Sequence, residues 1–191
     1  MTAWRRSRPA SRHDAWMRLV AAAPPAWVLA HARAVEALAD AMAARAEAAG
    51  LPVDRELVRA GALLHDIGRS RVQDVTHAHV GAEMLRGEHW PDPLVRVVER
   101  HTGAGIRADE APRLGLPARD YSPVTLEERI VAAADNLHSG DRRLILDEVR
   151  AKYHAKGLLD ALARIEALHH ALCEELGTDL EALQSSPLPV P

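Results

Sequence analysis

Histidine and aspartate residues recur on the apolar faces of several predicted helices, where polar side chains are unexpected. His31, for example, follows Val28 by three residues and precedes Val35 by four, so its imidazole shares a helical face with those valines. A core-facing imidazole or carboxylate is unfavourable unless it is paired. Several of them in one chain satisfy each other most simply through a shared metal ion. The residues placed in this way are His31, His65, His77, His101 and Asp135, and Asp66 adjoins His65.

Mixed imidazole and carboxylate ligation favours first-row transition metals over magnesium or calcium. We therefore expect one or two divalent ions, iron first, with manganese, cobalt, nickel or zinc as alternatives. His79 competes with His77 from another helix face, but the apolar residues that follow favour His77. His138 is a candidate for an outer position beside the ligands. The other histidines are assigned no role and receive surface or packing interpretations: His13, His89, His154, His169 and His170.

The composition predicts that helices position these side chains. Alanine and leucine are abundant, phenylalanine is absent and only two tyrosines occur, which favours helices over strands. The chain is therefore expected to be all-α, with a loop over residues 103–124. The predicted helix boundaries are marked by caps, prolines and glycines. Gly50 ends the first long helix, Asp54 and Gly68 bound the second, and Thr76 and Gly87 bound the third. Asp92 with Pro93 opens the fourth helix, a Thr125–Glu128 capping box opens the fifth, and Gly177 closes the last.

The length of 191 residues fits one domain over residues 15–184, preceded by a flexible basic arm at 1–14 and followed by a tail at 185–191. A net charge of −3 argues against a dedicated nucleic-acid binder. Cys173, the single cysteine, excludes a disulfide framework and is expected to be a core thiol. No apolar run approaches the ~18 residues that a membrane span needs, and we expect a cytoplasmic protein.

Four sequence strings resemble the HD superfamily of metal-dependent phosphohydrolases. GALLHDIGR at residues 61–69 is similar to the central motif of that superfamily, and AADN at 133–136 supplies the later aspartate. HAHVGAE at 77–83 and VVERHT at 97–102 are similar to the additional histidine segments of its two-metal branch. The resemblance is closest to the small stand-alone HDIG-domain proteins, and it extends to diadenosine-tetraphosphate hydrolases of the superfamily.

The resemblance implies a compact HD-domain helical bundle whose metals are held by His31, His65, Asp66, His77, His101 and Asp135. It implies cleavage of a phosphoester or phosphoanhydride, with a nucleotide as the expected substrate. Two cations bridged by Asp66 would activate water and neutralise phosphoryl charge. Arg69 stands where the superfamily usually has lysine. Arg69, Arg142 and Arg143 follow the metal motifs in sequence and are candidate phosphate donors.

Two alternative functions remain open at this stage. A di-iron oxygenase of the same superfamily would use the same six ligands, and a non-catalytic nucleotide- or RNA-associated module would bind without turnover. A homodimer is also possible. The 103–123 loop is expected to form part of the pocket rim, where Tyr121 either stacks on a nucleobase or anchors the loop.

Overall fold

The computed structural model describes residues 11–186 and 188–190, and within them it confirms the all-α prediction. Among the described residues, eight α-helices carry the fold, together with three short 3₁₀ helices and one two-stranded hairpin. The helices are α1 (Arg12–Ala21), α2 (Ala26–Ala48), α3 (Arg55–Leu64), α4 (His77–Gly87), α5 (Asp92–Arg100), α6 (Leu126–Asn136), α7 (Leu146–Ala155) and α8 (Leu159–Leu176). The short elements are η1 (Ile67–Ser70), η2 (Ala111–Leu114), η3 (Leu180–Ala182), β1 (His138–Ser139) and β2 (Arg142–Arg143).

Several helix ends form as the sequence predicts. Asp54 caps α3 by accepting a hydrogen bond from the backbone N–H of Leu57. Thr125 and Glu128 form the capping box of α6, and Gly177 ends α8 with a left-handed conformation. Each of these signals depends on local backbone geometry alone, which is why it can be recognised in the sequence.

Other predicted boundaries are wrong or only partly right. The second predicted helix stops at Leu64, and the segment that contains Gly68 forms the separate turn η1. Thr76 and Gly87 do bound α4 as expected, but the Thr76 side chain makes no capping hydrogen bond, and its hydroxyl donates to the carboxylate of Asp74. Asp92 is the first residue of α5 and not its cap.

The predicted N-terminal arm is too long by at least three residues. Residues 12–14 form the first turn of α1, which is capped by Ser11. Arg12 forms an ion pair with the buried Glu36 of α2, so this turn is fastened to the domain. Residues 1–10, which carry the other predicted basic side chains of the arm, lie outside the described residues.

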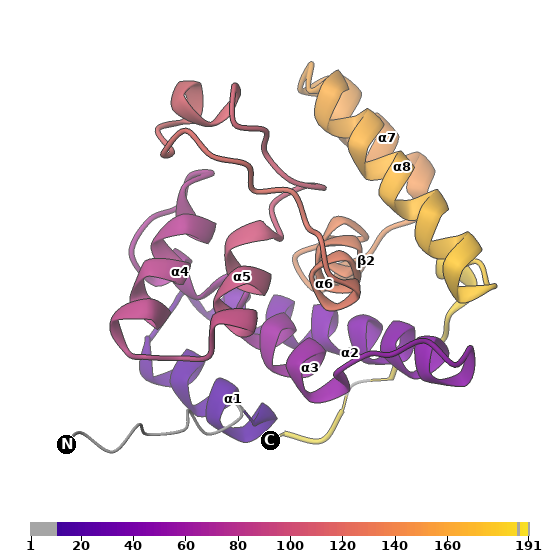
Figure 1. The fold of residues 1–191 in the computed structure, drawn as a ribbon, viewed down its shortest axis with the longest axis horizontal. Helices are drawn as coiled ribbons and strands as arrows, with labels where there is room; N and C mark the ends of the chain where they lie inside the picture. The colour runs from indigo at the N-terminus through magenta and orange to yellow at the C-terminus, as the bar shows by residue number, and fades with distance from the viewer. Residues whose placement is uncertain (1–10, 187, 191) are drawn as a thin grey trace.

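The core consists of two apolar clusters that share α2, a helix whose place among the others can be followed in Figure 1. One cluster joins α2 to α6 and α8, and the other joins the N-terminal part of α2 to α1, α3, α4 and α5. Val28 and Ala32 belong to the second cluster, whereas Val35 belongs to the first. His31 lies between these residues in sequence, so it sits where the two clusters meet.

The loop between α5 and α6 has a small core of its own, which settles the role of Tyr121. The tyrosine ring is only 3% exposed and packs with Ile106, Ala111 and Leu116. Its hydroxyl donates a hydrogen bond to the Pro117 carbonyl, 3.2 Å away. Tyr121 is therefore the anchor of the loop and has no free face on which a base could stack.

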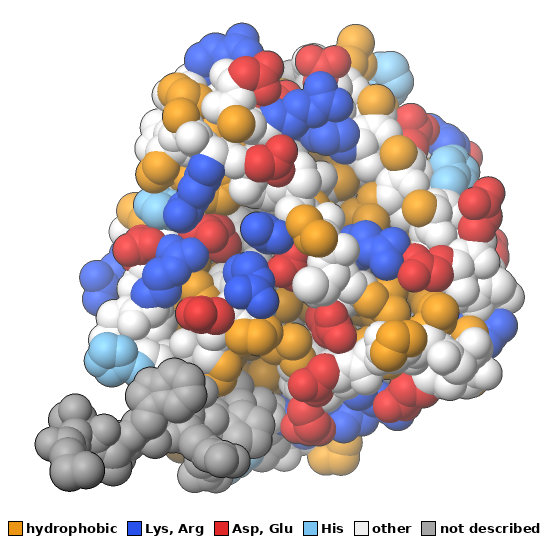
Figure 2. Space-filling view, in the orientation of Figure 1, with side chains coloured by type: hydrophobic (Ala, Val, Ile, Leu, Met, Phe, Trp, Pro, Cys, Tyr) orange, Lys and Arg blue, Asp and Glu red, His pale blue; other side chains and the backbone are white. Residues whose placement is uncertain are grey.

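The surface carries mixed charge on the face shown in Figure 2, where basic and acidic side chains lie interspersed and no broad basic patch forms. Ion pairs also join segments distant in sequence, such as Arg18 with Glu88 and Arg129 with Glu175. Among the described residues, no helix has the length and apolar character required to cross a membrane.

A buried carboxylate joins α2 to α3 and makes the stability of the fold depend on pH. Asp40 accepts hydrogen bonds from Arg55 and Arg59, both with Nε···Oδ1 distances of 2.6 Å. Burial opposes ionisation, but the two guanidinium groups hold the pKa of Asp40 below its ordinary value. A lowered carboxyl pKa stabilises the fold at pH values above the unfolded pKa of ~3.9, and this contribution is lost as the pH falls through the folded-state pKa.

Asp40→Asn is therefore expected to lower the free energy of unfolding by ~1.5–3 kcal/mol at pH 7 and to have a much smaller effect at pH 2–3. Urea denaturation across this pH range measures both values. Glu47→Gln removes a more exposed partner of Arg55 and should change stability by less than ~1 kcal/mol. Equal losses for Asp40→Asn at both ends of the pH range would contradict the assignment.

Candidate metal centre

The predicted ligands come from five helices and lie mostly at helix ends. His65 is the residue that caps the C-terminus of α3, and Asp66 follows it at the start of η1. His77 is the first residue of α4 and His101 directly follows α5. Asp135 lies in the last turn of α6 and His31 in the second turn of α2. The sequence placed them along helix faces, whereas the fold brings helix ends together.

Each of the four histidines is held by a backbone carbonyl. A carbonyl oxygen only accepts, so Nδ1 of each ring must be the donor, and this leaves Nε2 facing the centre. The Nδ1···O distances are 2.7 Å from His31 to Gly140, 2.7 Å from His65 to Ala62, 2.7 Å from His77 to Asp74 and 2.8 Å from His101 to Val98. This is the outer hydrogen bond that metal-binding histidines make.

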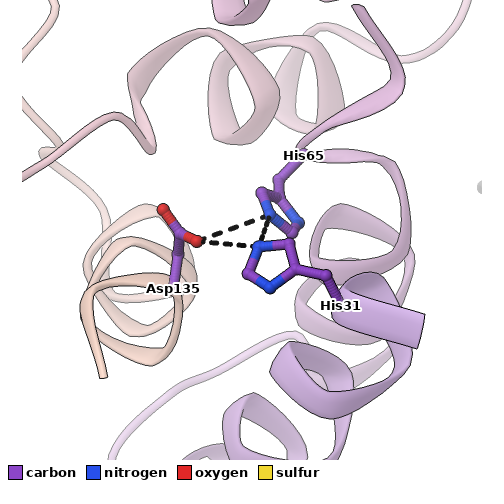
Figure 3. Close-up of side chains that lie close together, drawn as sticks. All are labelled: His31, His65 and Asp135. Atoms are coloured by element: carbon purple, nitrogen blue, oxygen red, sulfur yellow. Dashed lines mark hydrogen bonds and ion pairs between the residues drawn. The ribbon is translucent and has the colours of Figure 1, made fainter. Parts of the chain in front are cut away.

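The first group of side chains consists of His31, His65 and Asp135, which point toward one another in Figure 3. The Nε2 atoms of the two histidines are 3.0 Å apart. Oδ1 of Asp135 lies 3.0 Å from Nε2 of His31 and 3.6 Å from Nε2 of His65. Both imidazoles are buried, while the Asp135 side chain is 23% exposed.

The second group is formed by His77 and His101, with Asp66 between the two groups. The Nε2 atoms of His77 and His101 are 3.1 Å apart. Oδ1 of Asp66 faces this pair at 2.9 and 3.6 Å. Oδ2 faces the other pair, at 3.7 Å from His31 and 3.8 Å from His65. One carboxylate thus presents one oxygen to each pair of imidazoles.

These donors fit metal ions. In a neutral imidazole whose Nδ1 donates, Nε2 carries a lone pair, so two such nitrogens facing each other at 3.0 Å need either a proton or a metal ion between them. Two ligand nitrogens bound ~2.1 Å from one cation stand ~3.0–3.4 Å apart, which matches both imidazole pairs. The donor set therefore suits two transition-metal ions bridged by Asp66.

The electrostatics prepare the ligands for a cation. Burial lowers the pKa of His65 to about 4, so its ring is neutral at pH 7. Although burial opposes protonation, the hydrogen bond and charge of Asp135 raise the pKa of His31 to about 9. Burial also disfavours the ionised form of Asp66, but the adjacent His65, His101 and His77 hold its pKa well below the ordinary value. The carboxylates therefore stay ionised in the interior, and the protonated His31 ring compensates part of their charge until a metal ion replaces the proton on Nε2.

The three predicted phosphate-binding arginines differ in position. Arg69 lies at the centre, where its Nε donates to Oδ2 of Asp66 at 2.7 Å. Arg142 is 63% exposed and pairs with Glu148. Arg143 donates to the carbonyls of Leu180 and Leu183 in the C-terminal segment. The fold thus brings Arg69 to the ligands and gives the other two guanidinium groups structural partners elsewhere.

Two further histidines were weighed against the predicted ligands. His79 lies on another face of α4, near Glu99 and Arg119, and so is not directed at the centre. His138 is buried beside His31, with ring centroids 6.4 Å apart, and its Nδ1 donates to the Ala134 carbonyl. His138 therefore lies just outside the ligands and packs against His31.

Sequence reasoning missed the hairpin that orients His31. The β1–β2 pair closes through Gly140, whose carbonyl receives the His31 hydrogen bond. Gly140 has φ = +61°, the left-handed conformation that glycine adopts without strain. The string Ser-Gly-Asp at 139–141 was the available turn signal.

The chain matches one family model, several known proteins and a solved structure. The HD domain family matches residues 28–140. A tRNA (cytidine(56)-2'-O)-methyltransferase of Thermoplasma volcanium is 49% identical over 157 residues, 82% of this chain and 45% of that protein. An uncharacterised protein of Methanocaldococcus jannaschii is 49% identical over 129 residues, 68% of this chain and 76% of that protein. The crystal structure of the L. monocytogenes phosphodiesterase PgpH HD domain in complex with cyclic-di-AMP superposes with a TM-score of 0.50 at 19% identity, over 85% of this chain and 95% of that one.

A helical bundle that converges four imidazoles and two carboxylates defines a metal-binding domain of the HD type. The chain belongs to the HD domain family, the superfamily of metal-dependent phosphohydrolases that its motifs resemble. It spans less than half of the length of the methyltransferases that it matches. At 19% identity, the likeness to PgpH concerns the fold alone.

Proposed function

We propose that this protein hydrolyses a phosphoester or phosphoanhydride bond of a nucleotide at a two-metal centre. The observation that carries the proposal is the position of Asp66, with Oδ1 toward His77 and His101 and Oδ2 toward His31 and His65. When bound, two divalent transition metals at these positions would act as Lewis acids that activate water and neutralise phosphoryl charge.

The chain's own residues would hold and orient the substrate. Arg69 is 22% exposed, and its guanidinium lies 5.5 Å from the centre of the Trp27 ring. Stacking on Trp27 and hydrogen bonding to Asp66 fix the planar group at the edge of the centre. From there the guanidinium can donate to phosphate oxygens as charge forms on them.

A groove of about 510 Å³ supplies a place for the nucleoside part of the substrate. Its walls are the segment after α5 and the turn between α7 and α8, and its volume is in the range of small-molecule sites. Thr102, which adjoins the candidate ligand His101 in sequence, is among its lining residues. The apolar lining includes Ile106, Leu114 and Leu158, which would cover the face of a base.

Lys152 of α7 is a further candidate for a phosphate contact, one that sequence reasoning missed. It is half-buried, and among the described residues no carboxylate lies within ion-pair distance of its amine. Burial lowers the pKa of Lys152, while the charge of Asp135 acts in the opposite direction. An unpaired ammonium group that lies close enough to Asp135 to interact with its charge can also attract an anionic substrate.

Lys152→Met is expected to raise the KM for a nucleotide substrate about tenfold or more, because a charge-assisted hydrogen bond contributes ~1.5–3 kcal/mol. The value of kcat should change less. Steady-state kinetics measure both constants. Lys156→Met, one helical turn further and exposed, is the matched control, and the same increase of KM in both variants would rule out a specific contact by Lys152.

A second candidate is a non-catalytic, RNA-associated module. The methyltransferase of Thermoplasma volcanium is named for action on tRNA, and 82% of this chain matches it. Such a module predicts tight, salt-sensitive RNA binding without turnover.

The test begins with metal analysis of protein purified without added metal. The same protein is then assayed with nucleoside monophosphates, dinucleoside polyphosphates, a small aryl phosphodiester and an RNA oligonucleotide, each under several divalent metals. We expect about two ions per chain and phosphate release from a nucleotide without O₂. RNA binding without cleavage would favour the second candidate, and an iron-dependent spectrum that responds to O₂ would favour the oxygenase.

A further inference from the structure

A second group of metal-binding side chains lies at the C-terminal end of α8, on elements that contribute no residue to the HD centre. His169 and Cys173 are one helical turn apart on α8, and Asp179 follows the end of that helix. One ligand atom from each of the three residues lies within 4.8 Å of the others. They line an open depression of about 540 Å³. The sequence had predicted only a core thiol here, whereas Cys173 is partly exposed beside two other donors.

His169 is the observation that points to a ligand. The residue is only 6% exposed, yet within the described part of the chain neither ring nitrogen has a hydrogen-bond partner. Its ring contacts are with His170, and its electrostatic neighbours include Asp179 and Glu181. The ring is largely buried, but its nitrogens remain open to the depression, and one of them is free to bind a cation shared with Cys173 and Asp179.

Among the described residues, no basic side chain pairs with Asp179, whereas a comparable group of donors on α4 and α5 is neutralised by an arginine. His79, Glu83 and Glu99 meet the same distance criterion, but Arg86 pairs with both glutamates there. At the end of α8, no ion pair is formed by Asp179 among the described residues. Its Oδ1 accepts only the backbone N–H of Glu181, at 2.9 Å.

The local field favours a positive ion at this position. The last turn of α8 contains no basic residue, although the C-terminus of a helix carries partial negative charge. Glu174 and Glu181 add carboxylates beside the thiol. The guanidinium groups near this end already have other partners. Arg150 pairs with Asp147 and Glu166, Arg143 donates to the carbonyls of Leu180 and Leu183, and Arg45 donates to the Gly177 carbonyl.

We propose that His169, Cys173 and Asp179 form a second metal site, which takes a thiophilic divalent cation of the zinc class. Sulfur, nitrogen and oxygen donors are the ligands of tetrahedral zinc, with water as the fourth ligand. In such a site the ligand atoms stand ~3.3–3.8 Å apart, so the group must close by at most about 1.5 Å. Binding releases the thiol proton to solvent as the sulfur becomes a thiolate ligand.

The ion would fasten the end of α8 to the turn that starts η3. This turn leads into the segment whose carbonyls accept hydrogen bonds from Arg143. The second metal site therefore has a structural effect that does not depend on the proposed hydrolysis.

Cobalt(II) is the probe, because a thiolate bound to cobalt gives a charge-transfer absorption band in the near ultraviolet. Cys173 is the only cysteine in the chain, and the HD centre contains no sulfur ligand, so this band reports on the proposed site alone. We expect the band in the wild-type protein at one equivalent, and in Asp66→Ala as well. We also expect zinc to displace the cobalt.

Cys173→Ser should abolish the band while leaving phosphatase activity unchanged, and His169→Ala should weaken cobalt binding at least tenfold. His170→Ala is the matched control and should behave as the wild type. Circular dichroism verifies that each variant is folded. The absence of the band from the wild-type protein, or equal cobalt affinity in His169→Ala and His170→Ala, would overturn the proposal.

Discussion

Asp66→Asn is expected to remove both metal ions and to lower phosphohydrolase turnover by about a thousandfold or more, while the helical circular dichroism spectrum is retained. The substitution keeps the shape of the side chain but removes the charge that faces both imidazole pairs. Losing a single preorganised charge-stabilising group in an active site costs ~10²–10³ in kcat, and Asp66 serves two ions. Metal analysis and steady-state kinetics on the same preparation measure the two losses.

Two further variants are compared with Asp66→Asn, one as a control outside the centre and one that removes a single ligand. Asp109→Asn alters an exposed aspartate outside the centre and should leave metal content and turnover unchanged. His101→Ala removes a ligand from one group only, and should reduce the metal content toward one ion per chain. Full turnover by Asp66→Asn would show that the centre is wrongly assigned, and unchanged two-metal content in His101→Ala would remove that histidine from it.

Gly68→Ala is expected to lower the free energy of unfolding by ~3 kcal/mol or more and to disturb the group of His77 and His101. A Cβ atom at Gly68 would lie 2.0 Å from the carbonyl oxygen of His77 and 2.7 Å from the backbone nitrogen of Gly81. Both contacts are with backbone of α4, so a rotamer change cannot relieve them, and overpacking of this kind costs ~1–3 kcal/mol or more. The relief available is movement of α4 away from η1, which separates His77 from Asp66. Urea denaturation and metal analysis measure the two effects.

Gly87→Ala is the matched control for this substitution. Gly87 ends the same helix, and nothing lies within 4 Å of its added Cβ, so we expect unchanged or slightly increased stability. If Gly68→Ala does not fold, Gly81→Ala tests the same contact more mildly, because its Cβ would lie 3.1 Å from the nitrogen of Gly68. Wild-type stability and metal content in both variants would contradict the close packing of η1 on α4.

The candidate ligands could be predicted from the sequence because each is a polar side chain at a position where the helical pattern expects a buried apolar one. A histidine such as His31, set between Val28 and Val35, has to be paired wherever the helix packs. Helix caps such as Asp54 and the Thr125–Glu128 box were equally readable, since each depends on a few consecutive residues. These features are local, so chain order alone specifies them.

The tertiary structure decided which donors lie together and which do not. Arg69 and Arg143 both follow metal motifs in sequence, yet Arg69 reaches Asp66 while Arg143 binds carbonyls near the C-terminus. Long side chains can turn several ways, so packing selects their partners. The groove beside Thr102 and the approach of His169 to Asp179 likewise arise between segments distant in sequence.

The sequence by itself determined an all-α chain with imidazoles and carboxylates directed inward. Helix propensity, capping and the period of the hydrophobic residues each depend only on residues close together in the chain. Only the tertiary structure decided the distances at which Asp66 faces the two imidazole pairs, and only it showed that Gly140 orients His31. The physical reason is that these distances depend on how helix ends pack around shared cores, and a few degrees of helix tilt would separate donors that now lie about 3 Å apart.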